Sequence, residues 1–86
     1  MSRFGVILDI LTEAFKNPVS EEDYYKIVDL LRKYIREDTT AEQHELAIRG
    51  FPSSYHPCDH MERIRFGMTF GGKDNAVLKD LFARAV

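Results

Sequence analysis

Histidine and cysteine side chains gather in one short stretch of the sequence, where His56, Cys58 and His60 alternate around Pro57. With His44 upstream, they could supply the imidazole and thiolate ligands that zinc prefers. Structural zinc sites usually take their ligands from two separated pairs of residues, and that spacing is absent here. We therefore expect no metal site. A metal-binding regulator that uses these four residues stays an alternative.

The same residues are candidates for nucleophilic catalysis, with Cys58 as nucleophile and His56 or His60 as base. Catalysis of this kind also needs an oxyanion hole, which nothing in the sequence provides. We therefore predict that the chain is not an enzyme and carries no cofactor. Cys58 is instead expected to be a small buried side chain near the start of a helix that Pro57 and Asp59 begin. A lone cysteine forms no internal disulfide, which fits a reducing, cytoplasmic compartment.

A second candidate for ligand binding is Gly71-Gly72-Lys73, which precedes a predicted helix. Bare amides and a lysine at a helix start are features of phosphate-binding loops. A P-loop has a longer glycine frame and a Ser or Thr after the lysine, whereas Asp74 follows here and would repel a phosphate. We expect a turn between two helices, with small-ligand binding as the alternative.

The charge balance limits the classes of partner. Twelve basic and fourteen acidic residues give a formal net charge of −2, which disfavours non-specific binding to nucleic acid or to an anionic membrane. No apolar run approaches the roughly 20 residues that cross a bilayer. A chain of 86 residues is too short for two independent cores, so we expect one small domain over 1–86.

The spacing of apolar residues predicts an all-α fold. Asn17-Pro18 ends the first helix, and Ser20 caps the second. We expect a compact bundle of four to five short helices, opened by an antiparallel hairpin in which Leu11 faces Leu31. The predicted helices are 4–15, 21–37, a short one from Thr40 to Gly50, one after Asp59, and one that Asp74 or Asn75 caps. In the short helix, the core face is expected to comprise Ala41, His44, Ala47, Ile48 and Phe51.

The segment 62–70 fits two structures. Its apolar residues alternate with polar or small ones as in a half-buried strand, yet Asp59 with Glu62 forms a capping box and Gly71-Gly72 would end a helix. The sequence offers no second strand for pairing. We predict a helix. The alternative is an α+β fold whose strand at 62–70 pairs across a dimer.

Aromatic residues exceed what one small core can cover, so some are expected at an interface with another protein or with a second copy of the chain. The predicted function is a non-enzymatic protein–protein interaction module, such as an inhibitor, adaptor or regulatory subunit. The alternative is a metal- or small-ligand-binding regulator. The expected partner-binding residues are Phe66, Phe70, Arg63, Arg65, Tyr55 and Tyr25.

No motif identifies a family. In length, mild acidity and its Ser20-Glu21-Glu22 helix start, the sequence resembles in general style the small helical immunity proteins that block nuclease bacteriocins. That family carries a Tyr-Tyr-Pro segment, and this chain has Tyr55-His56-Pro57 in the corresponding region. With one tyrosine and different neighbours, the resemblance assigns no role to any residue.

Overall fold

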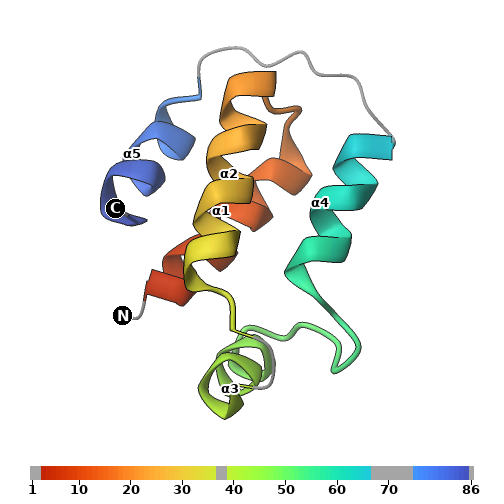
Figure 1. Ribbon diagram of the computed structural model, residues 1–86. Helices are drawn as coiled ribbons and strands as arrows, with labels where there is room; N and C mark the ends of the chain where they lie inside the picture. The colour runs from red at the N-terminus through yellow and green to blue at the C-terminus, as the bar shows by residue number, and fades with distance from the viewer. Residues whose placement is uncertain (1–2, 37–38, 67–74, 86) are drawn as a thin grey trace.

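The computed structural model describes residues 3–36, 39–66 and 75–85, all of whose regular secondary structure is helical. The predicted all-helical class is confirmed for these residues, and 62–66 is helix rather than strand. Phe70 and Gly71-Gly72-Lys73 lie outside the described residues. Within the described ranges, no helix has the length and apolar character needed to cross a membrane. The helices are α1 (Arg3–Lys16), α2 (Glu21–Tyr34), α3 (Thr40–Ile48), α4 (Pro57–Phe66) and α5 (Ala76–Ala85), as Figure 1 shows.

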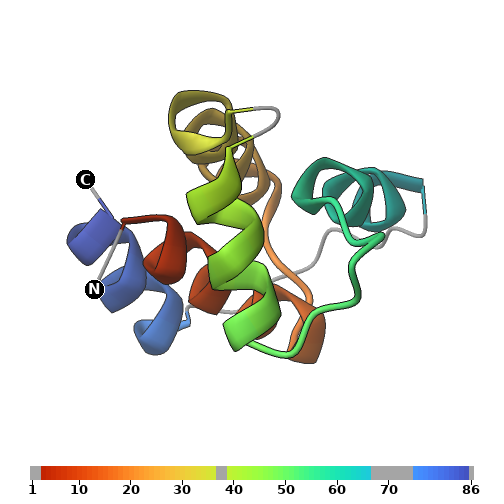
Figure 2. The ribbon, with the colours of Figure 1, turned by 90° about the horizontal axis from the view of Figure 1, so that it is seen from below.

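Helix α1 is the central element. Its first half is apolar around almost the whole circumference, so it can be covered from several sides. Helices α2, α3 and α5 all pack against it, and α4 packs against α2. Figures 1 and 2 show α5 and α4 on opposite sides of the α1–α2 pair. The buried residues of α1 are Phe4, Gly5, Val6, Ile7, Leu8, Ile10, Leu11 and Ala14.

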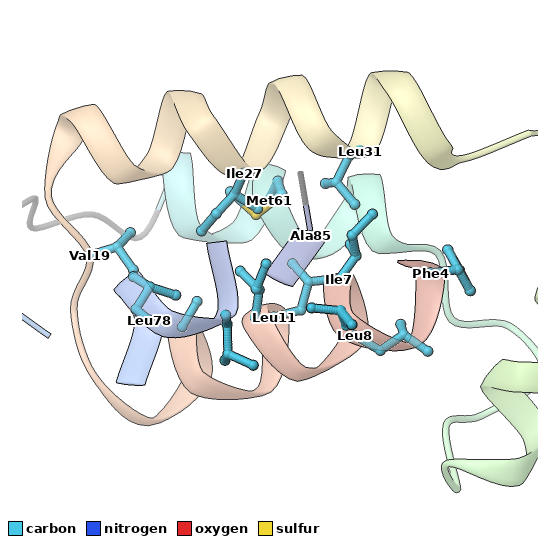
Figure 3. Close-up of a cluster of buried hydrophobic side chains, with 14 of the residues drawn as sticks. Phe4, Ile7, Leu8, Leu11, Val19, Ile27, Leu31, Met61, Leu78 and Ala85 are labelled. Atoms are coloured by element: carbon cyan, nitrogen blue, oxygen red, sulfur yellow. The ribbon is translucent and has the colours of Figure 1, made fainter. Parts of the chain in front are cut away.

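The core is mainly aliphatic, with Phe4 and Tyr24 as its buried aromatic residues. Burying an aliphatic side chain completely contributes about 1.5–3 kcal/mol relative to leaving it in water. In the helix predicted over 4–15, the three-four spacing places Phe4, Ile7, Leu8, Leu11, Ala14 and Phe15 on the apolar face. All of them are buried except Phe15, which is 62% exposed. Figure 3 shows core side chains from α1, α2, α4 and α5, among them Ile7, Leu11, Ile27, Leu31, Met61, Leu78 and Ala85.

Two helix starts are capped as predicted. The backbone N–H of Asp23 donates to the Ser20 hydroxyl at 3.2 Å, and the N–H of Leu78 donates to Oδ1 of Asn75 at 3.1 Å. These bonds satisfy amides that have no partner inside the helix. The amide nitrogen of Asn75 also donates to Oε1 of Glu13 at 3.3 Å, which links the start of α5 to α1.

The predicted core face of α3 is wrong. Its predicted core residues within the helix are exposed, with Ile48 67% exposed, and the buried residue is Leu46. Polar contacts set this orientation: Glu42 accepts from the backbone N–H of Arg36 at 3.0 Å, and Arg49 pairs with Asp9 of α1. Because Glu42, Leu46 and Arg49 share one side of the helix, these contacts turn that side toward the rest of the molecule.

Candidate functional site

A pocket of about 360 Å³ lies between the end of α1, the loop 51–56 and α4. Aromatic rings of Phe15, Phe51 and Tyr55 form part of its lining. Polar side chains of Asp59, His60 and Arg63 join them from α4. Aromatic walls with a few polar groups are typical of small-molecule binding sites.

The end of α3 places Phe51 in this pocket. Gly50 has a φ of 80°, which favours glycine, and its N–H donates to the carbonyl of Ala47 at 3.1 Å. The next N–H, that of Phe51, donates to the carbonyl of Leu46 at 3.0 Å. This pair of bonds is the Schellman arrangement that ends many helices, and it directs the chain from α3 back toward α1.

A tight turn then places Tyr55 beside Phe51. The N–H of Tyr55 donates to the carbonyl of Pro52 at 2.9 Å. The two aromatic rings stack, with centroids 4.5 Å apart and an interplanar angle of 27°. Stacking of this kind favours one arrangement of the loop, so the rings form a defined wall.

Helix α4 begins two residues before the capping box predicted at Asp59. Pro57 occupies the first helical position, which suits a residue without an N–H. His56 takes the capping role, because its Nδ1 accepts from the N–H of Cys58 at 3.2 Å and its carbonyl accepts from the N–H of His60 at 3.3 Å. With this start, His60 faces inward and is only 3% exposed.

His60 is buried among rings and lacks a conventional partner at one nitrogen. Its ring contacts the Phe15 ring edge-on, with centroids 3.7 Å apart, and the Tyr55 ring lies 6.2 Å away. Its Nε2 has no hydrogen-bond partner among the described residues. Burial lowers the pKa of His60, and the nearby charge of Arg63 lowers the pKa further, so the imidazole is neutral at pH 7.

The hydroxyl of Tyr55 is the second buried polar group of this region. It is buried and has no hydrogen-bond partner in the part of the chain that the structure describes. Burial raises the pKa of Tyr55 to about 12, so the phenol keeps its proton. Leaving a buried polar group unpaired costs about 1–3 kcal/mol, and native proteins contain few such groups. Both atoms belong to residues that line this pocket, which marks the region as the candidate site.

No family model, curated protein or solved structure matches the chain.

The predicted partner-binding residues divide between the pocket and the outer surface. Tyr55 and Arg63 line the pocket, while Phe66 is 84% exposed at the end of α4. Asp59, Arg63 and Phe66 are spaced to share one side of α4, but Phe66 is not among the residues that line the pocket. The remaining described residues lie elsewhere: Arg65 borders α2 on the other side of α4, and Tyr25 is 57% exposed on α2.

The histidines and the cysteine do not assemble a metal site. Among the described residues, no three His, Cys, Asp or Glu side chains form a group that could hold a metal ion. His44 is exposed on α3, whereas His60 is buried under α1. Cys58 is exposed, so the prediction that it is buried is wrong. Cys58 lies one turn before Met61, at the solvent-exposed edge of the contact between α2 and α4, while Met61 is buried.

Another depression, of about 400 Å³, lies between α2 and α5. It is mainly apolar, with Leu30 and Phe82 in its lining and the Lys26 ammonium 5.7 Å from the centre of the Phe82 ring. Neither buried unpaired polar atom of the described residues belongs to it. Its hydrogen-bonding groups are the charged side chains of Lys26, Asp29 and Lys33, and within the described ranges it has no counterpart of the buried His60 imidazole.

Phe15, Phe51 and Asp59 line the pocket but are not among the predicted site residues. Phe15 continues the apolar spacing of α1 and was therefore assigned to the core, and Phe51 was assigned to the core face of α3. The available signal was position: each aromatic ring stands at the end of a helix next to a proline-containing turn. Side chains at the ends of helices often do not lie on the apolar face that the rest of the helix forms.

Proposed function

We propose that this chain is a small, non-enzymatic protein–protein interaction module that binds a second copy of itself or another protein through the exposed end of α4. The observation that carries the proposal is the 84% exposure of Phe66. Exposing a large aromatic ring forgoes most of the free energy its burial would contribute. An interface that covers the ring would recover that free energy, and aromatic residues are enriched at interface centres.

The neighbours of Phe66 fit the edge of such an interface. Successive residues turn about 100° around an α-helix, so Arg63 and Arg65 fall on opposite sides of Phe66. Both arginines are exposed. A central aromatic side chain with a polar, charged border is the arrangement typical of binding hot spots.

A second exposed aromatic residue, Tyr25, lies on α2, the helix that packs against α4. It is 57% exposed and lies near the start of α2. The start of α2 and the end of α4 lie at the same end of the molecule (Figure 1). We therefore include Tyr25 with Phe66 as the aromatic part of the proposed interface.

In this proposal the five helices act as a compact bundle, opened by an antiparallel α1–α2 hairpin, that holds α4 in a fixed orientation. Such a scaffold suits an inhibitor, an adaptor or a regulatory subunit acting in the cytoplasm. A small-ligand-binding regulator is the second candidate function, and the unpaired Nε2 of His60 favours it. The interface is centred on Phe66 and the ligand site on His60, and Arg63 borders both.

Light scattering coupled to size-exclusion chromatography, over a range of concentrations, tests the interface. We expect Phe66→Asp to weaken self-association at least about tenfold, because it places a charge at the centre of an apolar contact. Ile48→Asp is the matched control, since Ile48 is 67% exposed on α3. Circular dichroism should show the same helicity for both variants.

If the wild-type chain is a monomer throughout, self-association is wrong, and the partner must be another protein. Immobilised wild-type and Ile48→Asp chains should then retain a partner that Phe66→Asp does not. Equal behaviour of the two variants in both assays would contradict the proposed interface.

A further inference from the structure

We propose that the pocket around His60 binds a small, uncharged aromatic ring that carries one hydrogen-bonding group, as a phenol or an indole does. This inference does not depend on the interface at Phe66. It rests on the shape of the pocket, the kind of side chains that form its walls, and the two unpaired polar atoms in those walls.

The walls favour a flat aromatic ligand. Phe51 and Tyr55 form a stacked pair, and Phe15 presents a ring that is 62% exposed. A ring placed against them makes stacked or edge-on contacts and removes the Phe15 ring from water. At about 360 Å³, the pocket is near the lower end of the range for small-molecule sites, roughly 300–1,000 Å³. One or two fused rings match this size better than a larger molecule.

The buried polar atoms favour a ligand with a neutral hydrogen-bonding group. The His60 side chain is 3% exposed, and its Nε2 has no partner among the described residues. The Tyr55 hydroxyl is the second unpaired group. Because the imidazole and the phenol are both neutral at pH 7, they match a hydroxyl or a ring N–H.

Movement of Phe15 would give a ligand access to His60. The Phe15 ring meets the imidazole edge-on, and this contact supplies no conventional hydrogen bond to Nε2. Since Phe15 stands in the last turn of α1 and is mostly exposed, its side chain can rotate without opening the core. A ligand ring would then lie between the Phe15 ring and the imidazole, so Phe15 remains one of the walls that the ligand contacts.

The charges on the pocket favour an uncharged ligand. Asp59 and Arg63 both line it and carry opposite charges. For a carboxylate on the ligand, attraction by Arg63 offsets repulsion by Asp59, and the reverse holds for an ammonium group, so the two side chains give no net preference for either sign. A neutral ligand enters the pocket without losing the hydration of a charge.

Titration of the full ¹⁵N-labelled chain with 4-methylphenol and indole, followed by NMR, tests this inference. We expect saturable shifts at the amides of Phe51, Tyr55 and His60. Toluene has a similar ring but no hydrogen-bonding group, so it should bind about 3- to 10-fold more weakly than 4-methylphenol. Benzoate, which is charged, should also bind more weakly.

The variant His60→Phe separates the polar contact from the aromatic wall. It keeps a ring at this position but removes Nε2, so the advantage of 4-methylphenol over toluene should fall below about twofold. Phe51→Leu is the second variant: it leaves His60 in place and should weaken 4-methylphenol and toluene alike by removing a stacking surface. Absence of saturable shifts, or an unchanged advantage in His60→Phe, would overturn the inference. If His60→Phe does not fold, unchanged binding to Phe51→Leu overturns it.

Two further measurements distinguish a tyrosine side chain from a free small molecule as the natural ligand, and the pocket from the interface at Phe66. N-acetyltyrosinamide carries the same phenol on a peptide backbone, so binding of it as well as 4-methylphenol supports a tyrosine side chain as the natural occupant. Binding of 4-methylphenol alone supports a free small molecule. Phe66→Asp should bind these probes as tightly as the wild-type chain does, because the interface and the pocket are proposed independently.

Discussion

The two sides of α1 are built from different kinds of side chain. Toward α2 and α5, fully buried aliphatic residues such as Ile7 and Leu11 meet Ile27 and Leu78. Toward the loop 51–56, the contacts are made by aromatic rings, and Phe15 remains largely exposed. The helix starts next to the core have paired polar groups, whereas the pocket contains two buried polar atoms that lack partners in the described residues.

Adjacent residues of α4 lie on the boundary between these regions. Met61 is buried in the aliphatic core, while His60 faces the aromatic pocket. The core therefore supplies stability on one side of the helix. The other side retains groups that reduce stability unless a ligand or partner satisfies them. This division is common where proteins keep strained or unpaired groups for function.

The largest expected effect is in the aliphatic core. Leu11→Ala and Leu31→Ala should each lower the free energy of unfolding by about 2–5 kcal/mol, because the two side chains are 0% and 3% exposed and their removal leaves a cavity. Ile48→Ala, on the exposed side of α3, should change it by less than about 0.5 kcal/mol. Urea unfolding followed by circular dichroism measures all three. A loss below about 1 kcal/mol for both leucine variants would contradict the proposed packing of α1 against α2.

A substitution in the pocket should raise the free energy of unfolding, whereas the core substitutions lower it. Tyr55→Phe removes only the unpaired hydroxyl, so the free energy of unfolding should rise by about 1 kcal/mol. The control is Tyr34→Phe, since the hydroxyl of Tyr34 accepts a hydrogen bond from Arg3 at 2.7 Å and its loss should give no gain. The same urea unfolding measurements apply. A loss of stability in Tyr55→Phe would show that the hydroxyl is satisfied in solution.

Much of the helical pattern could be predicted from local signals. Ser20 and Asn75 were identified as possible caps because short polar side chains hydrogen-bond to amides a few residues ahead. The apolar stripe of α5 also matches its burial at Leu78, Leu81 and Ala85. Phe66 was expected on the surface and is exposed, although what covers it stays a prediction.

The orientation of α3 and the pocket depend on contacts between distant segments. The spacing of apolar residues predicts that Ile48 lies in the core. This local pattern contains no information about the pairing of Arg49 with Asp9, forty residues earlier. The pocket needs the turn at Gly50, the early start of α4 and the end of α1 to meet. Sequence spacing identified His60 as chemically interesting for metal binding. It could not show that aromatic rings from two other segments would surround it.

Acidification should affect the pocket more than the core. The pKa of His60 is lowered in the folded chain relative to 6.5, so the unfolded chain binds the proton more readily. Stability is therefore fully present above about pH 6.5 and falls as the pH drops from there toward the lower pKa of the folded state. Urea unfolding at pH values between 7.5 and 5 should show this decrease for the wild-type chain. The decrease should be smaller in His60→Phe, and an identical pH dependence would show that other groups cause it.

The smallest expected effect tests whether polar contacts orient α3. Asp9 and Arg49 are both partly exposed, so their pairing should contribute about 0.5–1 kcal/mol, far less than a core leucine. A double-mutant cycle with Asp9→Asn and Arg49→Gln isolates this coupling, because contacts that Arg49 makes with other groups, such as Glu45, cancel between the two arms of the cycle. The coupling should weaken in 1 M salt, where exposed charges are screened. The Lys26–Glu22 pair of α2 is the matched control, since it joins residues one turn apart and fixes no helix against another. A coupling of zero between Asp9 and Arg49 would assign the orientation of α3 to Leu46 and the turn at Gly50 instead, and Leu46→Ala would then be expected to release the helix.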